Sequence, residues 1–312
     1  MIIAVSLLCM MLCGTPVLHA SQIQFQRAYD ATDAILKYTW HDHNQQRQRV
    51  TLRLPQDALK RGNVEFQSFS NTAMMNNTAK ALQSFAQEQN QGRKQLTVTP
   101  QQNQIQFNFR GFSSAEIDRL QNEMKQIKDA TEAAFLRQTF YTSFNNYVMP
   151  DHRRIAKRYV PALRPLAEAM APGMPRGQRA QINHMLSFFQ SIPYDELLNR
   201  RTSNGAGFQT PYGLLLNNRG DCDTKSVALA ALLRNFFPRM RLLIVYVPGH
   251  AFVGIQQLPT QGDRSIKVNG KPFILADPTG PRPLELGEVD EESLSYLRQR
   301  QYSFQEVPFH SR

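Results

Sequence analysis

The amino-acid sequence predicts an α+β fold, and three observations lead to that prediction. Residues 227–237 show the apolar spacing of a helix, with Pro238 as its stop. Residues 241–256 form a β-rich run that a Pro-Gly turn interrupts. The N-terminal half holds alternating, strand-like segments beside segments with helical spacing. Helices and strands are therefore expected along the whole chain.

The first element, residues 1–20, is typical of a secretory signal. It holds no Asp, Glu, Lys or Arg, and its apolar run ends in small and turn-forming residues, which makes Ala20 the predicted cleavage point. A basic N-terminal region is missing, and Leu18 is larger than this position favours, so an uncleaved membrane anchor is the alternative. We expect the protein to be exported, either to a periplasm or to the medium.

Residues 21–140 are predicted to form a small α+β N-terminal domain, to which no residue pattern assigns a role. Strand-like alternation marks residues 48–54, 94–100 and 103–109, and helical spacing marks residues 71–89 and 113–140. Residues 141–179 follow as a basic helical connector punctuated by prolines. Residues 180–312 are predicted to form the last domain, which contains the candidate catalytic residues considered below.

The chain is basic, with a formal net charge of +11 and a pI near 9.8. Its densest local cluster contains His152, Arg153, Arg154, Lys157 and Arg158. No nucleic-acid-binding motif is recognisable, so an anionic envelope polymer or lipid surface is the better candidate partner. The alternative is an ordinary solvated helix face.

Cys222 is the cysteine on which the functional argument depends. Cleavage at Ala20 removes Cys9 and Cys13 and leaves Cys222 as the one cysteine of the mature chain. Such a cysteine is a buried, inert hydrophobic residue, a partner in an intermolecular disulfide or a reactive thiol. Gly220 and Asp221 are typical of a turn and an N-cap, which puts Cys222 in the first turn of the predicted helix. The helix dipole favours a thiolate there, so we expect a lowered thiol pKa.

Two further residues could complete a nucleophilic site. His250 begins the second β-rich run, after the Pro-Gly turn, and Asp277 ends the apolar run of residues 271–276. A thiol nucleophile needs a base and a group that orients the base. Each residue alone is an ordinary turn residue, but the three together, at the edges of consecutive elements, favour a triad.

Residues about 180–290 resemble the transglutaminase-like superfamily of papain-type cysteine enzymes. The resemblance rests on "GDCDTKSVALAALL", "GHAFVGI" and "LADPTG" in that order. It implies an α+β fold with the cysteine-bearing helix packed on an antiparallel sheet. It also implies Cys222 as nucleophile, His250 as general base and acid, and Asp277 as the group that orients the imidazole. The segment "MLSFFQSIPYDE" makes Gln190 a candidate oxyanion donor, with a surface glutamine on an amphipathic helix as the alternative.

The predicted function is amide-bond chemistry on a protein or peptide through a thioester, without a cofactor. Water as acceptor gives a protease or amidase, and an amine acceptor gives transamidation; the three residues serve both outcomes. Two alternatives remain: an inactive binding or scaffold module, and a Cys222 that forms an intermolecular disulfide. His41 and His43 form an H-x-H pair with Asp42 between them, but the segment is typical of a hairpin turn, so no metal site is predicted.

Overall fold

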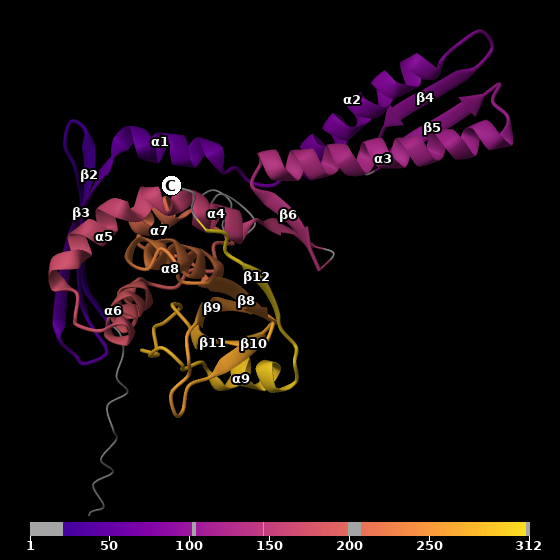
Figure 1. The fold of residues 1–312 in the computed structure, drawn as a ribbon. Helices are drawn as coiled ribbons and strands as arrows, with labels where there is room; N and C mark the ends of the chain where they lie inside the picture. The colour runs from indigo at the N-terminus through magenta and orange to yellow at the C-terminus, as the bar shows by residue number, and fades with distance from the viewer. Residues whose placement is uncertain (1–20, 102–103, 146, 199–206, 310–312) are drawn as a thin grey trace, which may run out of the picture.

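The computed structural model describes residues 21–101, 104–145, 147–198 and 207–309 and confirms the mixed α+β class. Figure 1 shows a body of helices and a sheet, a smaller sheet on one side of it, and an arm that projects from the other side. The expected signal, residues 1–20, lies outside the described residues. Within the described ranges, no helix combines the length and the apolar character needed to cross a bilayer.

A five-stranded antiparallel sheet carries two of the predicted site residues. Its strands are β8 (Leu242–Val247), β9 (His250–Gln256), β10 (Ser265–Val268), β11 (Lys271–Ala276) and β12 (Ser303–Glu306), in the order β10-β11-β9-β8-β12. Successive side chains face opposite sides of a strand. Leu242 and Ile244 therefore join the main core, whereas Leu243 and Val245 pack with residues of α9 (Glu291–Arg298). Both faces are covered, which explains the continuous apolar runs.

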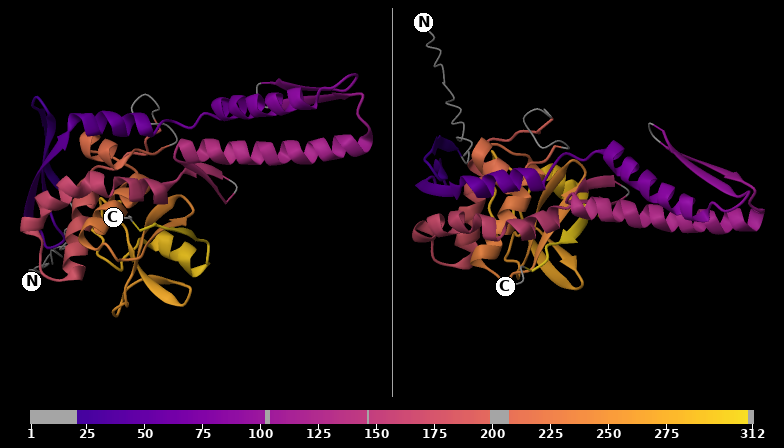
Figure 2. Two further views of the ribbon diagram at one scale, coloured as in Figure 1. Left: turned by 45° about the horizontal axis from the view of Figure 1, so that its top comes forward. Right: turned by 90° about the horizontal axis from the view of Figure 1, so that it is seen from above.

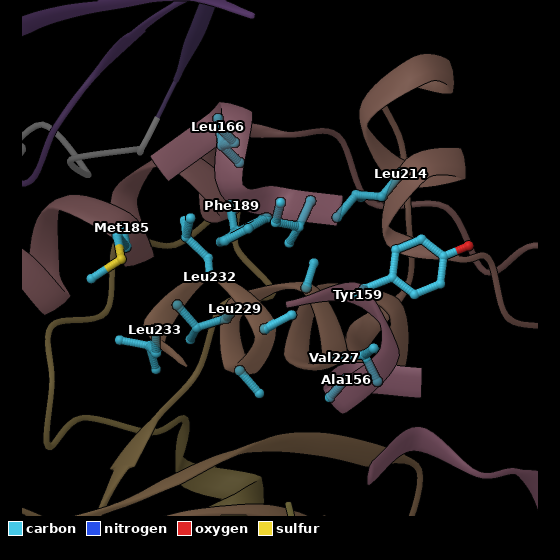
Figure 3. Close-up of a cluster of buried hydrophobic side chains, with 14 of the residues drawn as sticks. Ala156, Tyr159, Leu166, Met185, Phe189, Leu214, Val227, Leu229, Leu232 and Leu233 are labelled. Atoms are coloured by element: carbon cyan, nitrogen blue, oxygen red, sulfur yellow. The ribbon is translucent and has the colours of Figure 1, made fainter. Parts of the chain in front are cut away.

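Helix α8 (Cys222–Phe236) lies at the centre of the main core. Its N-cap is Asp221, whose side chain accepts a hydrogen bond from the Thr224 amide at 2.9 Å. The side chains of α8 from Thr224 to Arg234 are buried. The sheet packs on one side of the helix. The other sides are covered by helices, as Figure 3 shows for part of the core: α4 (His152–Tyr159), α5 (Arg164–Met170), α6 (Gln178–Ser191) and α7 (Pro211–Asn217). Helix α8 is thus held on all sides.

The N-terminal sheet belongs to the same core rather than to a separate domain. It consists of β1 (Gln22–Tyr29), β2 (Asp33–His41) and β3 (Arg47–Pro55), followed by α1 (Gln56–Glu65). Leu36, Tyr38 and Trp40 of β2 pack in the cluster that contains α6 and α8. The Trp40 indole N–H donates to Ser187 Oγ at 3.1 Å, and the Tyr38 hydroxyl donates to the Leu215 carbonyl at 2.5 Å.

The arm is a second, independent packing unit. Helices α2 (Asn71–Gln89) and α3 (Ser114–Gln138) pack with the hairpin of β4 (Gln95–Pro100) and β5 (Ile105–Arg110), and Figures 1 and 2 show this unit extending from the body. Its small core has Leu82, Leu96 and Met124 at its centre. Both predicted helices are present, and Ser113 and Glu116 form a capping box at the start of α3. The predicted N-terminal domain is therefore divided between the body and the arm.

The predicted connector is part of the body as well. After the hairpin of β6 (Tyr141–Phe144) and β7 (Tyr147–Pro150), helices α4 and α5, with short 3₁₀ turns at Pro161–Leu163 and Ala171–Gly173, bury Ile155, Tyr159 and Leu166 against the core. His152 was expected in a basic surface cluster. It is fully buried, because it lies on the inner side of α4 between Phe208 and Tyr246, so only the four Arg and Lys residues of that cluster remain near the surface.

The body and the arm have separate hydrophobic cores, so a leucine-to-alanine substitution should have a different effect on stability in each. Leu229→Ala, in α8, should lower the free energy of unfolding by about 2–5 kcal/mol in chemical denaturation, because a cavity in the central core cannot close. Leu82→Ala, in the arm, should increase amide hydrogen exchange within residues 71–138 and leave β8 and β9 protected. If Leu82→Ala lowered the amide protection of β8 and β9 as much as Leu229→Ala does, the arm and the body would unfold as one unit.

Candidate functional site

Cys222 lies at the start of α8, in a position that backbone packing fixes. The turn before it is tight, since a Cβ on Gly220 would lie 2.6 Å from a Leu214 methyl group. The Gly220 amide donates to the Pro193 carbonyl at 3.2 Å, and the Gly220 carbonyl accepts from the Asp195 amide at 3.2 Å. The segment after α6 therefore holds the turn that presents the thiol. Cys222 is 9% exposed, so the residue is largely buried.

His250 and Asp277 form the hydrogen-bonded pair expected from the sequence. His250 opens β9, Asp277 follows β11, and His250 Nε2 lies 2.8 Å from Asp277 Oδ2. The other carboxylate oxygen, Oδ1, accepts a hydrogen bond from the Thr279 amide at 2.9 Å. One oxygen of Asp277 therefore binds the backbone of the turn that follows β11, and the other binds the imidazole. In the neutral ring this fixes the proton on Nε2 and leaves a lone pair on Nδ1.

The thiol lies against the same strand as His250. The backbone N–H of Ala251, the residue after His250, makes a hydrogen bond to the Cys222 sulfur that favours the thiolate. One turn further along α8, the Ser226 hydroxyl donates to the Ala251 carbonyl at 3.1 Å. Both polar groups of Ala251 thus face α8, which brings the beginning of β9 to the beginning of the helix.

The surroundings of His250 favour its protonated form. Burial by itself disfavours the imidazolium, but the hydrogen bond with Asp277 and the charges of Asp277, Asp290 and Asp223 outweigh burial, so the pKa of His250 is raised. A histidine in this setting is a strong proton acceptor.

The expected lowering of the thiol pKa is not observed. Burial, followed by the nearby charges of Asp223 and Asp221, raises the pKa of Cys222 above its ordinary value despite the helix start. Asp223 Oδ1 accepts a weak hydrogen bond from the thiol at 3.9 Å. Burial and Asp223 also raise the pKa of Asp221 to about 7. A thiolate at this position would therefore need a positive charge beside it.

Gln190 does not have the role predicted for it. It is 1% exposed, and its side-chain amide nitrogen donates to two backbone carbonyls, those of Asp277 and Leu284, both at 2.7 Å. Both amide hydrogens are used, so Gln190 cannot donate to an oxyanion; nor is it a surface residue. It instead ties the Asp277 turn to α6.

Lys225 is a site residue that the sequence reasoning missed. Its ammonium group is fully buried beneath the triad and donates to the carbonyls of Ile192, at 2.6 Å, and Thr279, at 2.5 Å. Burial lowers its pKa to about 7, while the charges of Asp277, Asp221 and Cys222 act in the opposite direction. A lysine three positions after the cysteine, on the apolar side of a helix, was the available signal.

A second imidazole also approaches the thiol region. His152 Nδ1 lies 3.0 Å from the Tyr246 hydroxyl, and His152 Nε2 lies 3.6 Å from Asp223 Oδ2. Burial lowers the pKa of His152, with Asp223 and Asp151 acting in the opposite direction. Asp223 thus lies between this buried ring and the sulfur. Nothing in the sequence pattern linked His152 to Cys222, which is 70 positions away by their numbering.

The residues considered for metal binding contact different partners. His41 Nδ1 lies 3.3 Å from the Ser21 hydroxyl, and His43 Nε2 lies 2.8 Å from Gln190 Oε1. In the described ranges, one trio has potential ligand atoms within 4.8 Å of one another: His250, Asp277 and Asp290. Two of its members are the hydrogen-bonded pair itself.

The geometry has no counterpart in the comparisons with known proteins. No protein-family model, no curated protein and no solved structure matches the chain significantly. The family resemblance therefore rests on the residues around Cys222, His250 and Asp277 alone.

Neutralising the nearer carboxylate should make the thiol more acidic. In a His250→Ala background, where no imidazole titrates beside the sulfur, Asp223→Asn should move the pH midpoint of Cys222 alkylation down by about one pH unit, because a repelling charge is removed. Glu123→Gln on the arm is the matched control and should leave the midpoint in place. An unchanged midpoint in Asp223→Asn would exclude an electrostatic effect of Asp223 on the thiol.

Lys225 predicts a specific dependence of stability on pH. The folded chain releases the lysine proton near pH 7, whereas the unfolded chain holds it up to the ordinary pKa of 10.5. The unfolded state binds more protons in this window, so the contribution of Lys225 to stability should rise with pH from about 7 to 10.5.

This rise should be missing in Lys225→Met when the free energy of unfolding is measured at several pH values. Lys267→Met, which removes an exposed lysine of β10, should retain it. The same slope in both variants would contradict a depressed pKa for Lys225.

Proposed function

We propose that the protein is a cysteine-dependent enzyme that acts on amide bonds of a protein or peptide through a Cys222–His250–Asp277 triad and a thioester. One observation carries the proposal: the 2.8 Å pair of His250 and Asp277 adjoins Ala251, whose carbonyl accepts the Ser226 hydroxyl at 3.1 Å, one turn along α8 from Cys222. An acceptor nitrogen, its orienting carboxylate and a thiol at a helix start are the groups that nucleophilic acyl transfer requires.

The tautomer of the His250 imidazole determines how the first half-reaction, formation of the thioester, begins. With its proton on Nε2, held by Asp277, His250 takes the thiol proton at Nδ1. The sulfur forms a bond to the substrate carbonyl carbon, and the carbonyl π electrons move to oxygen. When this intermediate collapses, the C–N bond breaks and His250 returns the proton to the leaving amine. A thioester on Cys222 remains.

The oxyanion would be stabilised at the start of α8. The first amides of a helix have no intrahelical acceptor. The Thr224 amide donates to the Asp221 side chain and the Lys225 amide to the Asp221 carbonyl, which makes the amides of Cys222 and Asp223 the candidate donors. Gln190 has no part in this step.

The second half-reaction regenerates the thiol. An acceptor loses a proton to His250 and forms a bond to the thioester carbon; the C–S bond then breaks, and the thiolate recovers the proton. Water as acceptor gives a protease or amidase, the outcome we favour because water is always present. An amine acceptor gives transamidation.

The reactivity of Cys222 towards iodoacetamide tests the triad without a known substrate. At pH 7 the wild type should be alkylated at least about tenfold faster than His250→Ala, because the imidazole removes the thiol proton. In His250→Ala, burial and the carboxylates keep the thiol protonated until the pH is alkaline. His41→Ala is the control histidine variant and should behave as the wild type.

The competing functions give different results in the same series. A binding module that only retains the fold predicts slow alkylation with the same pH profile in the wild type and in His250→Ala. An intermolecular disulfide at Cys222 predicts a dimer on non-reducing gels that a reductant converts to monomer.

A further inference from the structure

We propose that His43, at the tip of the N-terminal hairpin, is a positioning residue for the triad: its Nε2–H holds the Gln190 amide, which in turn holds the Asp277 turn. The inference rests on the proposed function, and it gives the N-terminal sheet a role in the active site.

The orientation of the Gln190 amide is determined by its surroundings. Two carbonyl oxygens, of Asp277 and Leu284, lie 2.7 Å from one end of the amide, and only the NH₂ end can donate to both. The Oε1 end therefore faces His43 Nε2 at 2.8 Å. Since Oε1 is purely an acceptor, His43 Nε2 must carry a proton and donate it.

The turn that Gln190 holds is the one that carries Asp277. Gly280 in this turn has a φ of +63°, and a Cβ there would lie 2.3 Å from the Gln190 carbonyl oxygen, so the turn lies directly on the backbone of α6. Lys225 binds the Thr279 carbonyl from beneath. Gln190 thus fixes the first carbonyl of the turn, while Lys225 fixes the third. A rotation of the Gln190 amide would free the Asp277 carbonyl.

The hairpin is built to keep His43 in place. Asp42, 8% exposed, accepts the amides of Asn44 and Gln46 at 2.9 Å with one oxygen and the Gln48 side chain at 2.8 Å with the other. The hairpin is anchored to α6 by Trp40, which binds Ser187, one helical turn before Gln190. The path from the hairpin to His250 therefore consists of successive hydrogen bonds at 2.7–2.8 Å: His43 to Gln190, Gln190 to the Asp277 carbonyl, and the Asp277 carboxylate to His250.

Two variants of similar size and polarity separate this role from general stability. In His43→Gln the side-chain amide nitrogen reaches the place of Nε2 and retains the donor; in His43→Asn it reaches only the place of Nδ1. Iodoacetamide labelling of Cys222 across pH should stay within about twofold of the wild type in His43→Gln. In His43→Asn it should fall about tenfold at pH 7, with the profile displaced towards alkaline pH, because a displaced Asp277 no longer raises the pKa of His250.

The controls make failure of this inference distinguishable from failure of the triad. Thermal unfolding of both variants should match that of Asn44→Ala, a neighbouring substitution in the same hairpin. If His43→Asn is labelled like the wild type while His250→Ala is slow, the triad stands and the positioning role is wrong. If labelling of Cys222 is equally slow in His43→Gln and His43→Asn, the hydrogen-bond donor at the place of Nε2 does not determine reactivity, and the inference is also wrong. Equal labelling of the wild type and His250→Ala would overturn the proposed function itself.

Discussion

The burial of α8 is the constraint on which the rest of the structure depends. The helix has apolar side chains on every side, so it must be enclosed by the five-stranded sheet on one side and by helices on the others. That enclosure sets the position of its first residue, Cys222, relative to the beginning of β9. The backbone N–H of Ala251 interacts with Cys222, and its carbonyl accepts the Ser226 hydroxyl. These two interactions align the beginning of β9 with the first turn of α8.

The site combines an acidic environment with a basic chain. Asp221 and Asp223, beside the sulfur, oppose the thiolate, and burial does the same. Asp277 and Asp290, near the imidazole, favour its positive form. The surroundings of the thiol therefore favour its protonated form, and in the proposed mechanism its reactivity depends on His250 and on the pairing of His250 with Asp277. Under the proposed mechanism, the backbone contacts that orient Asp277 have a direct effect on the reactivity of the thiol.

Long-range contacts explain the division of the N-terminal half. The apolar face of β2 can be covered only by the helices of the body, whereas α2 and α3 cover the β4–β5 hairpin with their own apolar residues. The hairpin between β2 and β3 consequently lies against α6, next to Gln190. A segment whose sequence predicted only a hairpin turn thus acquires a structural connection to the candidate triad.

The sequence by itself determined the elements whose cause is local. The spacing of Val227 and Leu233, the cap at Asp221, the helical spacing of residues 113–140 and the turn before His250 each predicted an element that the structure contains. The residues of the candidate triad could also be named, because each stands at the edge of such an element. Only the tertiary structure decided the raised pKa of Cys222, the burial of His152 and Lys225, and the use of the Gln190 amide. These depend on which groups from distant segments come within a few ångströms, since desolvation and hydrogen bonding act at that range, and local sequence patterns do not encode it.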